Sequence, residues 1–180
     1  YPSVMDDTGL QGQMYTEVVQ RIKDAAAARI GESLVQIQDE TKLLQMVNIV
    51  YPGTSDVHDC YGETGLANCF HIDTRANTYK YKKEILDEYG PFLLASVISP
   101  FSCKIKSILD AIQISDGIVF IYSNWISGGI VPLILALEQN GYKRYEGKSM
   151  LSLSDERVKE SVPKEGQGNF MVIAGSAGFT

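Results

Sequence analysis

The feature that most constrains the fold is an unbroken apolar run at residues 118–122, Ile-Val-Phe-Ile-Tyr. Its β-branched and aromatic residues favour a strand. Because polar residues do not alternate with them, both faces of that strand should be covered, as in the centre of a parallel sheet. A polar, glycine-containing loop follows at residues 123–129. Residues 130–140 then predict a helix, with Pro132 tolerated in its first turn and Gly141 at its end.

A second apolar run at residues 170–174 predicts another buried strand. Strand, helix and strand in this order predict a right-handed crossover unit, and therefore an α/β fold with a parallel sheet. The polar stretch between helix and second strand has the character of an insertion, with a short helix at residues 155–161.

The N-terminal part of the chain is predominantly helical by pattern. Apolar spacing predicts helices at residues 9–30 and 40–49, and Gly31 can end the first of them. Residues 53–78 carry Gly, Asp, Thr, Ser and Asn without an apolar period, and predict an extended loop.

The middle of the chain begins with a predicted short charged helix at residues 79–89. Residues 92–98 fit either helix or strand. Ser102 has the character of a helix N-cap, because the residues after it form one apolar stripe at helical spacing: Ile105, Ile108, Leu109 and Ile112.

Composition places the chain among globular proteins, since 44% of its 180 residues are hydrophobic and 21% are charged. No apolar run reaches the roughly 18 residues needed to cross a bilayer. The net charge of −6 argues against strong nucleic-acid binding by the chain alone. Because the first residue is Tyr1, we expect the chain to be part of a longer protein.

The sequence lacks the residues that nucleotide hydrolysis requires and offers only a weak candidate for a metal site. The phosphate-binding loop of ATPases and an acidic pair after a buried strand are both absent from the sequence, so we expect no nucleotide hydrolysis by this chain alone. His58, Cys60, Cys69 and His71 resemble a zinc site only loosely in spacing, and a loop with free thiols is the favoured interpretation.

The candidate binding residues are Ser123, Asn124, Gly128 and Gly129 in the loop after the first predicted strand. Ligands bind at this end of parallel strands, where glycines admit a ligand to the backbone and a helix start favours an anion such as a phosphate. An ordinary strand-to-helix turn uses the same residue types. Trp125 suits either packing, which we favour, or stacking on a base.

Residues 117–145, GIVFIYSNWISGGIVPLILALEQNGYKRY, resemble the motif IV region of superfamily 2 helicases from nucleocytoplasmic large DNA viruses, of the poxvirus, iridovirus, asfarvirus and mimivirus-like kind. The matching positions are Tyr-Ser at 122–123, the small residues at 127–129 and Leu-Glu-Gln-Asn-Gly-Tyr at 137–142. Weaker resemblances lie at residues 13–15, 47–52, 102–105 and 172–175.

The resemblance implies a helical interdomain segment at residues 1–52, the extended loop at 53–78, and an incomplete second RecA-like domain at 79–180. It implies a parent helicase that uses ATP and Mg and works inside the cell, in the host cytoplasm or the virion. The cofactor-binding motifs would lie outside this chain, so no catalytic residue is assigned and we expect neither ATP nor metal to be bound by the chain alone.

The implied partners are a DNA or RNA backbone, contacted by Ser123 and Asn124, the first RecA-like domain of the parent and viral transcription proteins, with no membrane. The alternatives are a non-catalytic interaction or scaffold module of a viral transcription complex, and a small-molecule-binding α/β domain.

Overall fold

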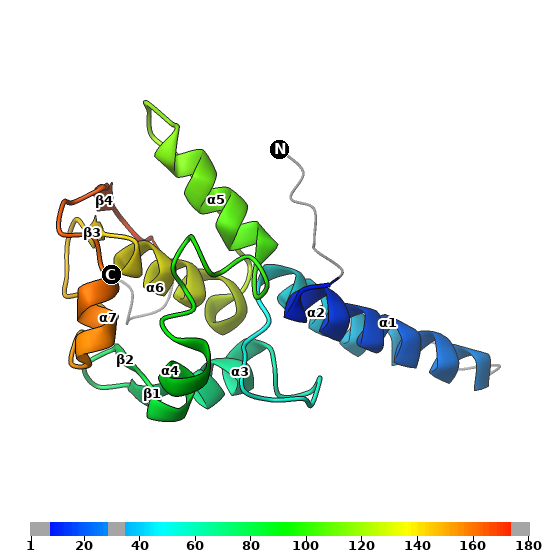
Figure 1. Ribbon diagram of the computed structural model, residues 1–180. Helices are drawn as coiled ribbons and strands as arrows, with labels where there is room; N and C mark the ends of the chain where they lie inside the picture. The colour runs from blue at the N-terminus through cyan, green and yellow to red at the C-terminus, as the bar shows by residue number, and fades with distance from the viewer. Residues whose placement is uncertain (1–7, 29–34, 174–180) are drawn as a thin grey trace.

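The computed structural model describes residues 8–28 and 35–173, which form a mixed α/β structure with two small sheets (Figure 1). Within these residues, no helix is both long and apolar enough to cross a membrane. The elements are α1 (Leu10–Ala28), α2 (Val35–Asn48), α3 (Gly62–Cys69), β1 (Phe70–Asp73), β2 (Thr78–Tyr81), α4 (Lys83–Tyr89), α5 (Cys103–Gln113), the π-helical turn η1 (Ile126–Ile130), α6 (Val131–Gln139), β3 (Tyr142–Arg144), α7 (Glu156–Ser161) and β4 (Gly168–Phe170).

Helices α1 and α2 lie side by side and project from the rest of the molecule (Figure 1). They confirm the two helices predicted from apolar spacing, although α2 begins at Val35, before the predicted start. The predicted terminator Gly31 lies outside the described residues. A small apolar cluster joins the two helices to the chain that follows, and consists of Met14, Val18, Met46, Val50, Val57 and Cys60.

The prediction of an extended loop at residues 53–78 is wrong, because α3 and a β-hairpin occupy much of this segment. Strands β1 and β2 pair antiparallel, with Phe70 opposite Tyr81. In the turn between them the Asp73 carboxylate accepts the Arg75 and Ala76 N–H groups at 2.9 and 3.0 Å, and Asn77 adopts a positive φ of 51°. The many turn-forming residues of this segment masked the pattern of one short helix and two short strands, whose few apolar side chains are buried.

The segment after the hairpin also differs from prediction. The helix predicted at residues 79–89 begins at Lys83, because residues 79–81 belong to β2. Residues 92–98 form successive turns, neither helix nor strand. Phe92 nevertheless lies at the centre of the main core, where its ring contacts those of Tyr81 and Phe101 at centroid distances of 5.6 and 5.3 Å.

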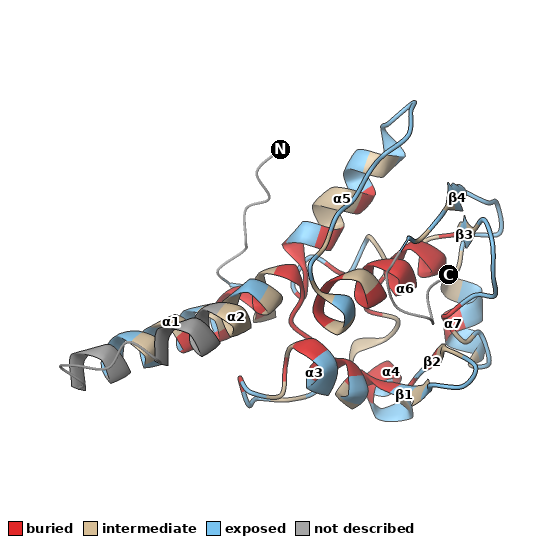
Figure 2. Ribbon diagram, turned by 180° about the vertical axis from the view of Figure 1, so that it is seen from behind, coloured by how far each residue is buried: buried red, intermediate tan, exposed pale blue. Residues whose placement is uncertain are grey.

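Helix α6 packs into that core, and every one of its residues is buried (Figure 2). It confirms the predicted helix, with Pro132 in the first turn and Gly141 beyond its end at a positive φ of 88°. Only glycine adopts that backbone conformation without strain, so it terminates the helix.

The prediction of buried strands at residues 118–122 and 170–174 is wrong, and so is the prediction of a crossover unit made from them. Residues 118–122 form no strand in the described structure, and Ile118 and Phe120 are 87% and 92% exposed. Strand β4 covers Gly168–Phe170 and pairs in parallel with β3, while Met171 and Ile173 are exposed. Ala174 lies outside the described residues.

The physical reason is that a strand needs a neighbour for its backbone hydrogen bonds. Strands β3 and β4 pair with each other, and no described segment forms a ladder with residues 118–122. The apolar run therefore borders a concavity of about 880 Å³ together with α5, α6 and residues 167–173. None of the described residues that line this concavity is charged.

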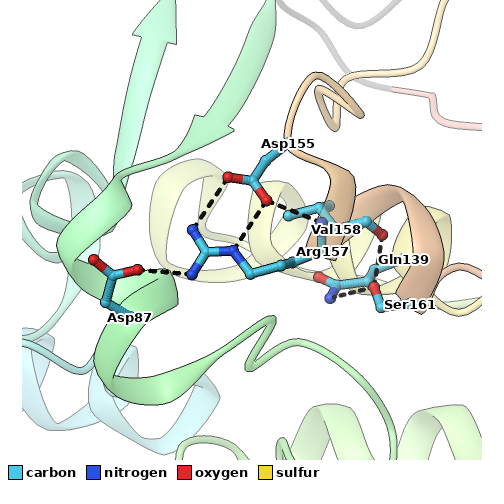
Figure 3. Close-up of polar contacts among 6 residues, drawn as sticks. All are labelled: Asp87, Gln139, Asp155, Arg157, Val158 and Ser161. Atoms are coloured by element: carbon cyan, nitrogen blue, oxygen red, sulfur yellow. Dashed lines mark hydrogen bonds and ion pairs between the residues drawn. The ribbon is translucent and has the colours of Figure 1, made fainter.

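Polar contacts join helix α7 to helices α4 and α6 (Figure 3). The Asp155 carboxylate caps it by accepting the Arg157 N–H at 3.0 Å. The Arg157 guanidinium contacts Asp155 at 3.2 Å and Asp87 of α4 at 2.7 Å, while the Gln139 side chain of α6 donates to the Ser161 hydroxyl at 3.4 Å. The Arg157 ion pairs are exposed, so they orient α7 more than they stabilise it.

Ser102 is confirmed as the N-cap of α5, because its hydroxyl accepts the Ile105 N–H at 2.9 Å. The same hydroxyl donates to the Asn48 carbonyl at the end of α2. We expect Ser102→Ala to lower the free energy of unfolding by about 1–3 kcal/mol, since it leaves a buried donor and a buried acceptor unpaired. Urea unfolding measures this effect. Ser99→Ala, at an exposed position, serves as the control, and an equal loss in both variants would contradict the capping role.

Candidate nucleic-acid interface

A pocket of about 260 Å³ lies between the end of α2, helix α5 and residues 121–125. It brings together three of the four predicted site residues, namely Ser123, Asn124 and Gly129, with Asn48 and Lys104. The remaining lining residues are apolar or aromatic: Leu44, Ile105, Ile108, Ile121, Tyr122, Trp125 and Leu133.

Gln11 holds one side of the pocket in place. It is only 1% exposed, and its side-chain amide donates to the Met46 and Val47 carbonyls at 2.7 and 3.1 Å. Its side-chain oxygen accepts the Cys103 N–H at 2.9 Å. One buried side chain of α1 thus joins the last turn of α2 to the first residue of α5.

This junction places Asn48 next to Lys104, whose ammonium group donates to the Asn48 side-chain oxygen at 2.8 Å. Lys104 is the only charged residue among the described residues that line the pocket. An ammonium group beside amide and hydroxyl groups can bind a phosphate oxygen. The pocket therefore offers a local positive charge in a chain whose net charge is −6.

The other side of the pocket is a tight turn built by Ser123. Its hydroxyl accepts the Trp125 N–H and donates to the Trp125 carbonyl, both at 3.2 Å. Asn124 is exposed at the pocket, and its side-chain oxygen accepts the Tyr122 hydroxyl. Ser123 therefore shapes the loop, while Asn124 presents an amide group to solvent.

Gly128 and Gly129 are explained by close packing. A Cβ atom at Gly128 would lie 2.9 Å from the Gln45 side-chain oxygen, and one at Gly129 would lie 2.2 Å from the Ser123 hydroxyl oxygen. Both residues lie in η1 instead of at a simple helix start, and only Gly129 lines the pocket. The Ile130 N–H is paired with the Trp125 carbonyl at 2.9 Å, so this donor is satisfied within the loop.

Two residues of the stretch 137–142 make hydrogen bonds that join the end of α6 to neighbouring loops. The Glu138 carboxylate accepts the Met150 and Leu151 N–H groups at 3.0 and 2.6 Å. The Asn140 side chain accepts the Ala95 N–H at 2.9 Å. These contacts tie loops to α6, and neither residue lines the pocket.

The cysteines near the two histidines are buried. The Cys60 and Cys69 thiols donate to the Val57 and Pro52 carbonyls at 3.4 and 3.3 Å. Burial raises the pKa of each thiol to about 12, so the thiolate that would ligate a metal is disfavoured. His58 and His71 are exposed. Among the residues that the structure describes, no group of three His, Cys, Asp or Glu side chains could hold a metal ion.

Among the pocket residues that were not predicted as site residues are the amide Asn48 and the cation Lys104. Both lie in stretches, 47–52 and 102–105, for which a helicase resemblance was an expectation from sequence, and that expectation was the available signal. Their meeting depends on packing between α2 and α5, because 56 positions separate them in sequence. Comparison of the chain with protein-family models, curated proteins and solved structures gives no significant match.

Proposed function

We propose that this chain contributes nucleic-acid backbone binding to an ATP-dependent helicase of the superfamily 2 type found in large DNA viruses. Its C-terminal part would be an incomplete second RecA-like domain, and Mg-ATP would be bound by other parts of the parent protein. The proposal rests on the meeting of three separate stretches of the chain at one pocket. Residues 47–52, 102–105 and 117–145, which resemble the helicases separately in sequence, all contribute to one pocket.

The charges of the pocket support a contributing role more than an independent one. Lys104 supplies one cation, and nucleic-acid affinity grows with the number of phosphates neutralised. A single contact in an acidic chain gives weak binding alone. The first RecA-like domain of the parent would supply the remaining contacts.

We expect Lys104→Ala to weaken binding of single-stranded DNA or RNA and to reduce the salt dependence of binding by about one phosphate contact. Fluorescence anisotropy of a labelled strand, measured over a range of salt concentrations, tests this. Lys106→Ala is the matched control, because Lys106 lies on the same helix, pairs with Asp110 and does not line the pocket. An unchanged salt slope in Lys104→Ala would contradict a phosphate contact there.

The alternative function is a protein-interaction or scaffold module of a viral transcription complex. The uncharged concavity beside residues 118–122 favours it, because large exposed apolar surfaces mark association sites. Ser123→Ala with Asn124→Ala in the parent protein separates the two functions. Loss of nucleic-acid-stimulated ATPase activity supports the helicase role, and unchanged stimulation supports the scaffold role.

A further inference from the structure

The wall of the 260 Å³ pocket is unsuited to a phosphate group alone. Most of its lining residues are apolar or aromatic, among them Leu44, Ile105, Ile108, Ile121, Trp125 and Leu133. A phosphate gains nothing from such a surface, because a charged group loses hydration against apolar atoms. A flat, weakly hydrated group with hydrogen-bonding edges is favoured there.

The polar groups of the pocket fit the edge of such a ring. Asn48 is 9% exposed, and its side-chain oxygen is already engaged by Lys104. The side-chain oxygen of Asn124 is engaged by the Tyr122 hydroxyl. Each carboxamide also carries two N–H donors, and the ring carbonyls and ring nitrogens of nucleobases accept such bonds.

The size of the pocket also limits the ligand. Its volume of about 260 Å³ lies slightly below the range of roughly 300–1,000 Å³ for drug-sized ligands. It therefore suits one base more than a stack of bases. Lys104 lies at the same pocket and can bind the phosphate attached to that nucleotide.

We propose that this pocket receives one unstacked nucleobase of a single-stranded nucleic acid, packed against Trp125 and hydrogen-bonded by Asn48 and Asn124. This inference rests on the proposed nucleic-acid function and adds base insertion to backbone contact. It assigns Leu44, Ile108 and Trp125 to the ligand, none of which a backbone-only contact requires.

Trp125 provides the measurement, because it is the only tryptophan in the sequence. The chain is titrated with a short oligothymidylate and with an abasic strand of the same length and charge, while tryptophan fluorescence is recorded. We expect the oligothymidylate to quench Trp125 and to bind about tenfold more tightly than the abasic strand. Equal affinity and equal quenching would overturn base insertion and leave backbone binding intact. Failure of both strands to bind even at low salt and high protein concentration, where a single phosphate contact is detectable, would overturn the proposed function as well.

A pair of variants locates the effect. Leu44→Ala removes part of the pocket lining at a residue that is 57% exposed, so the fold should tolerate it. Leu153→Ala changes an exposed leucine outside the pocket and is the control. We expect only Leu44→Ala to reduce the preference for the base-containing strand. Thymidine monophosphate forms a third arm. If it quenches Trp125 at the concentration at which the strand does, the site takes free nucleotides, and the assignment to a strand is overturned.

Discussion

Phe92→Ala should lower the free energy of unfolding by about 3–5 kcal/mol, whereas Phe120→Ala should change it by less than about 0.5 kcal/mol. The substitution is the same, but the surroundings differ. Phe92 is fully buried and its ring packs edge-on against Tyr81 and Phe101. Phe120 is 92% exposed, so its removal leaves no cavity.

Urea unfolding of both variants tests this pair, at several protein concentrations so that self-association through the apolar concavity is detected. A loss of several kcal/mol in Phe120→Ala would show that residues 118–122 are buried, as the sequence pattern predicts, and would contradict their observed exposure. A small loss in Phe92→Ala would contradict the central place of Phe92 in the core.

The helices could be predicted from sequence because their signals are local. Apolar spacing and end residues within a few positions identified α5 and α6, and Ser102 and Gly141 were recognised at their ends. Helix α3 and the hairpin after it were missed because their buried residues are few and lie among turn-forming residues. Short elements depend on tertiary packing more than on their own pattern.

The errors at residues 118–122 and 170–174 have one cause. An apolar run shows that a segment can form a buried strand, but hydrogen-bonded neighbours decide whether it does. In the described structure, β3 and β4 pair with each other, and both apolar runs border the same uncharged concavity. Local composition carries no information about that pairing.

The candidate site was predicted in part. Ser123, Asn124 and Gly129 lie together because they are close in sequence, and the structure places them at one pocket. Lys104 joins them only through the packing of α5, and its contact with Asn48 depends on the junction that Gln11 makes. Such a junction between three helices leaves no spacing pattern in the sequence.

Glu138→Ala should lower the free energy of unfolding by about 3 kcal/mol. The side chain is 7% exposed and accepts two backbone N–H groups, from Met150 and Leu151. Alanine leaves both buried donors unpaired. The segment that these donors hold also pairs with Tyr79 of β2, so its release would loosen one side of the core. Urea unfolding at neutral pH measures the loss.

The Glu138 carboxyl should also make the free energy of unfolding depend on pH. Burial raises its pKa above the ordinary value of 4.5, against the opposing effect of its hydrogen bonds. The folded state therefore binds the proton more tightly than the unfolded state. The contribution of this group is complete below pH 4.5 and decreases as the pH rises through the higher folded pKa.

Glu138→Gln, which cannot titrate, should therefore show its largest destabilisation relative to the natural protein at acid pH and a smaller one at neutral pH. The carboxamide NH2 group cannot accept the second N–H, whereas the hydroxyl oxygen of a protonated carboxyl can, so the loss at acid pH should be about 1–3 kcal/mol. Glu165→Gln at an exposed position is the control, and its difference from the natural protein should stay near zero across the same series. A Glu138→Gln difference that grows with pH would mean that the ionised carboxylate is favoured by folding, which its burial argues against.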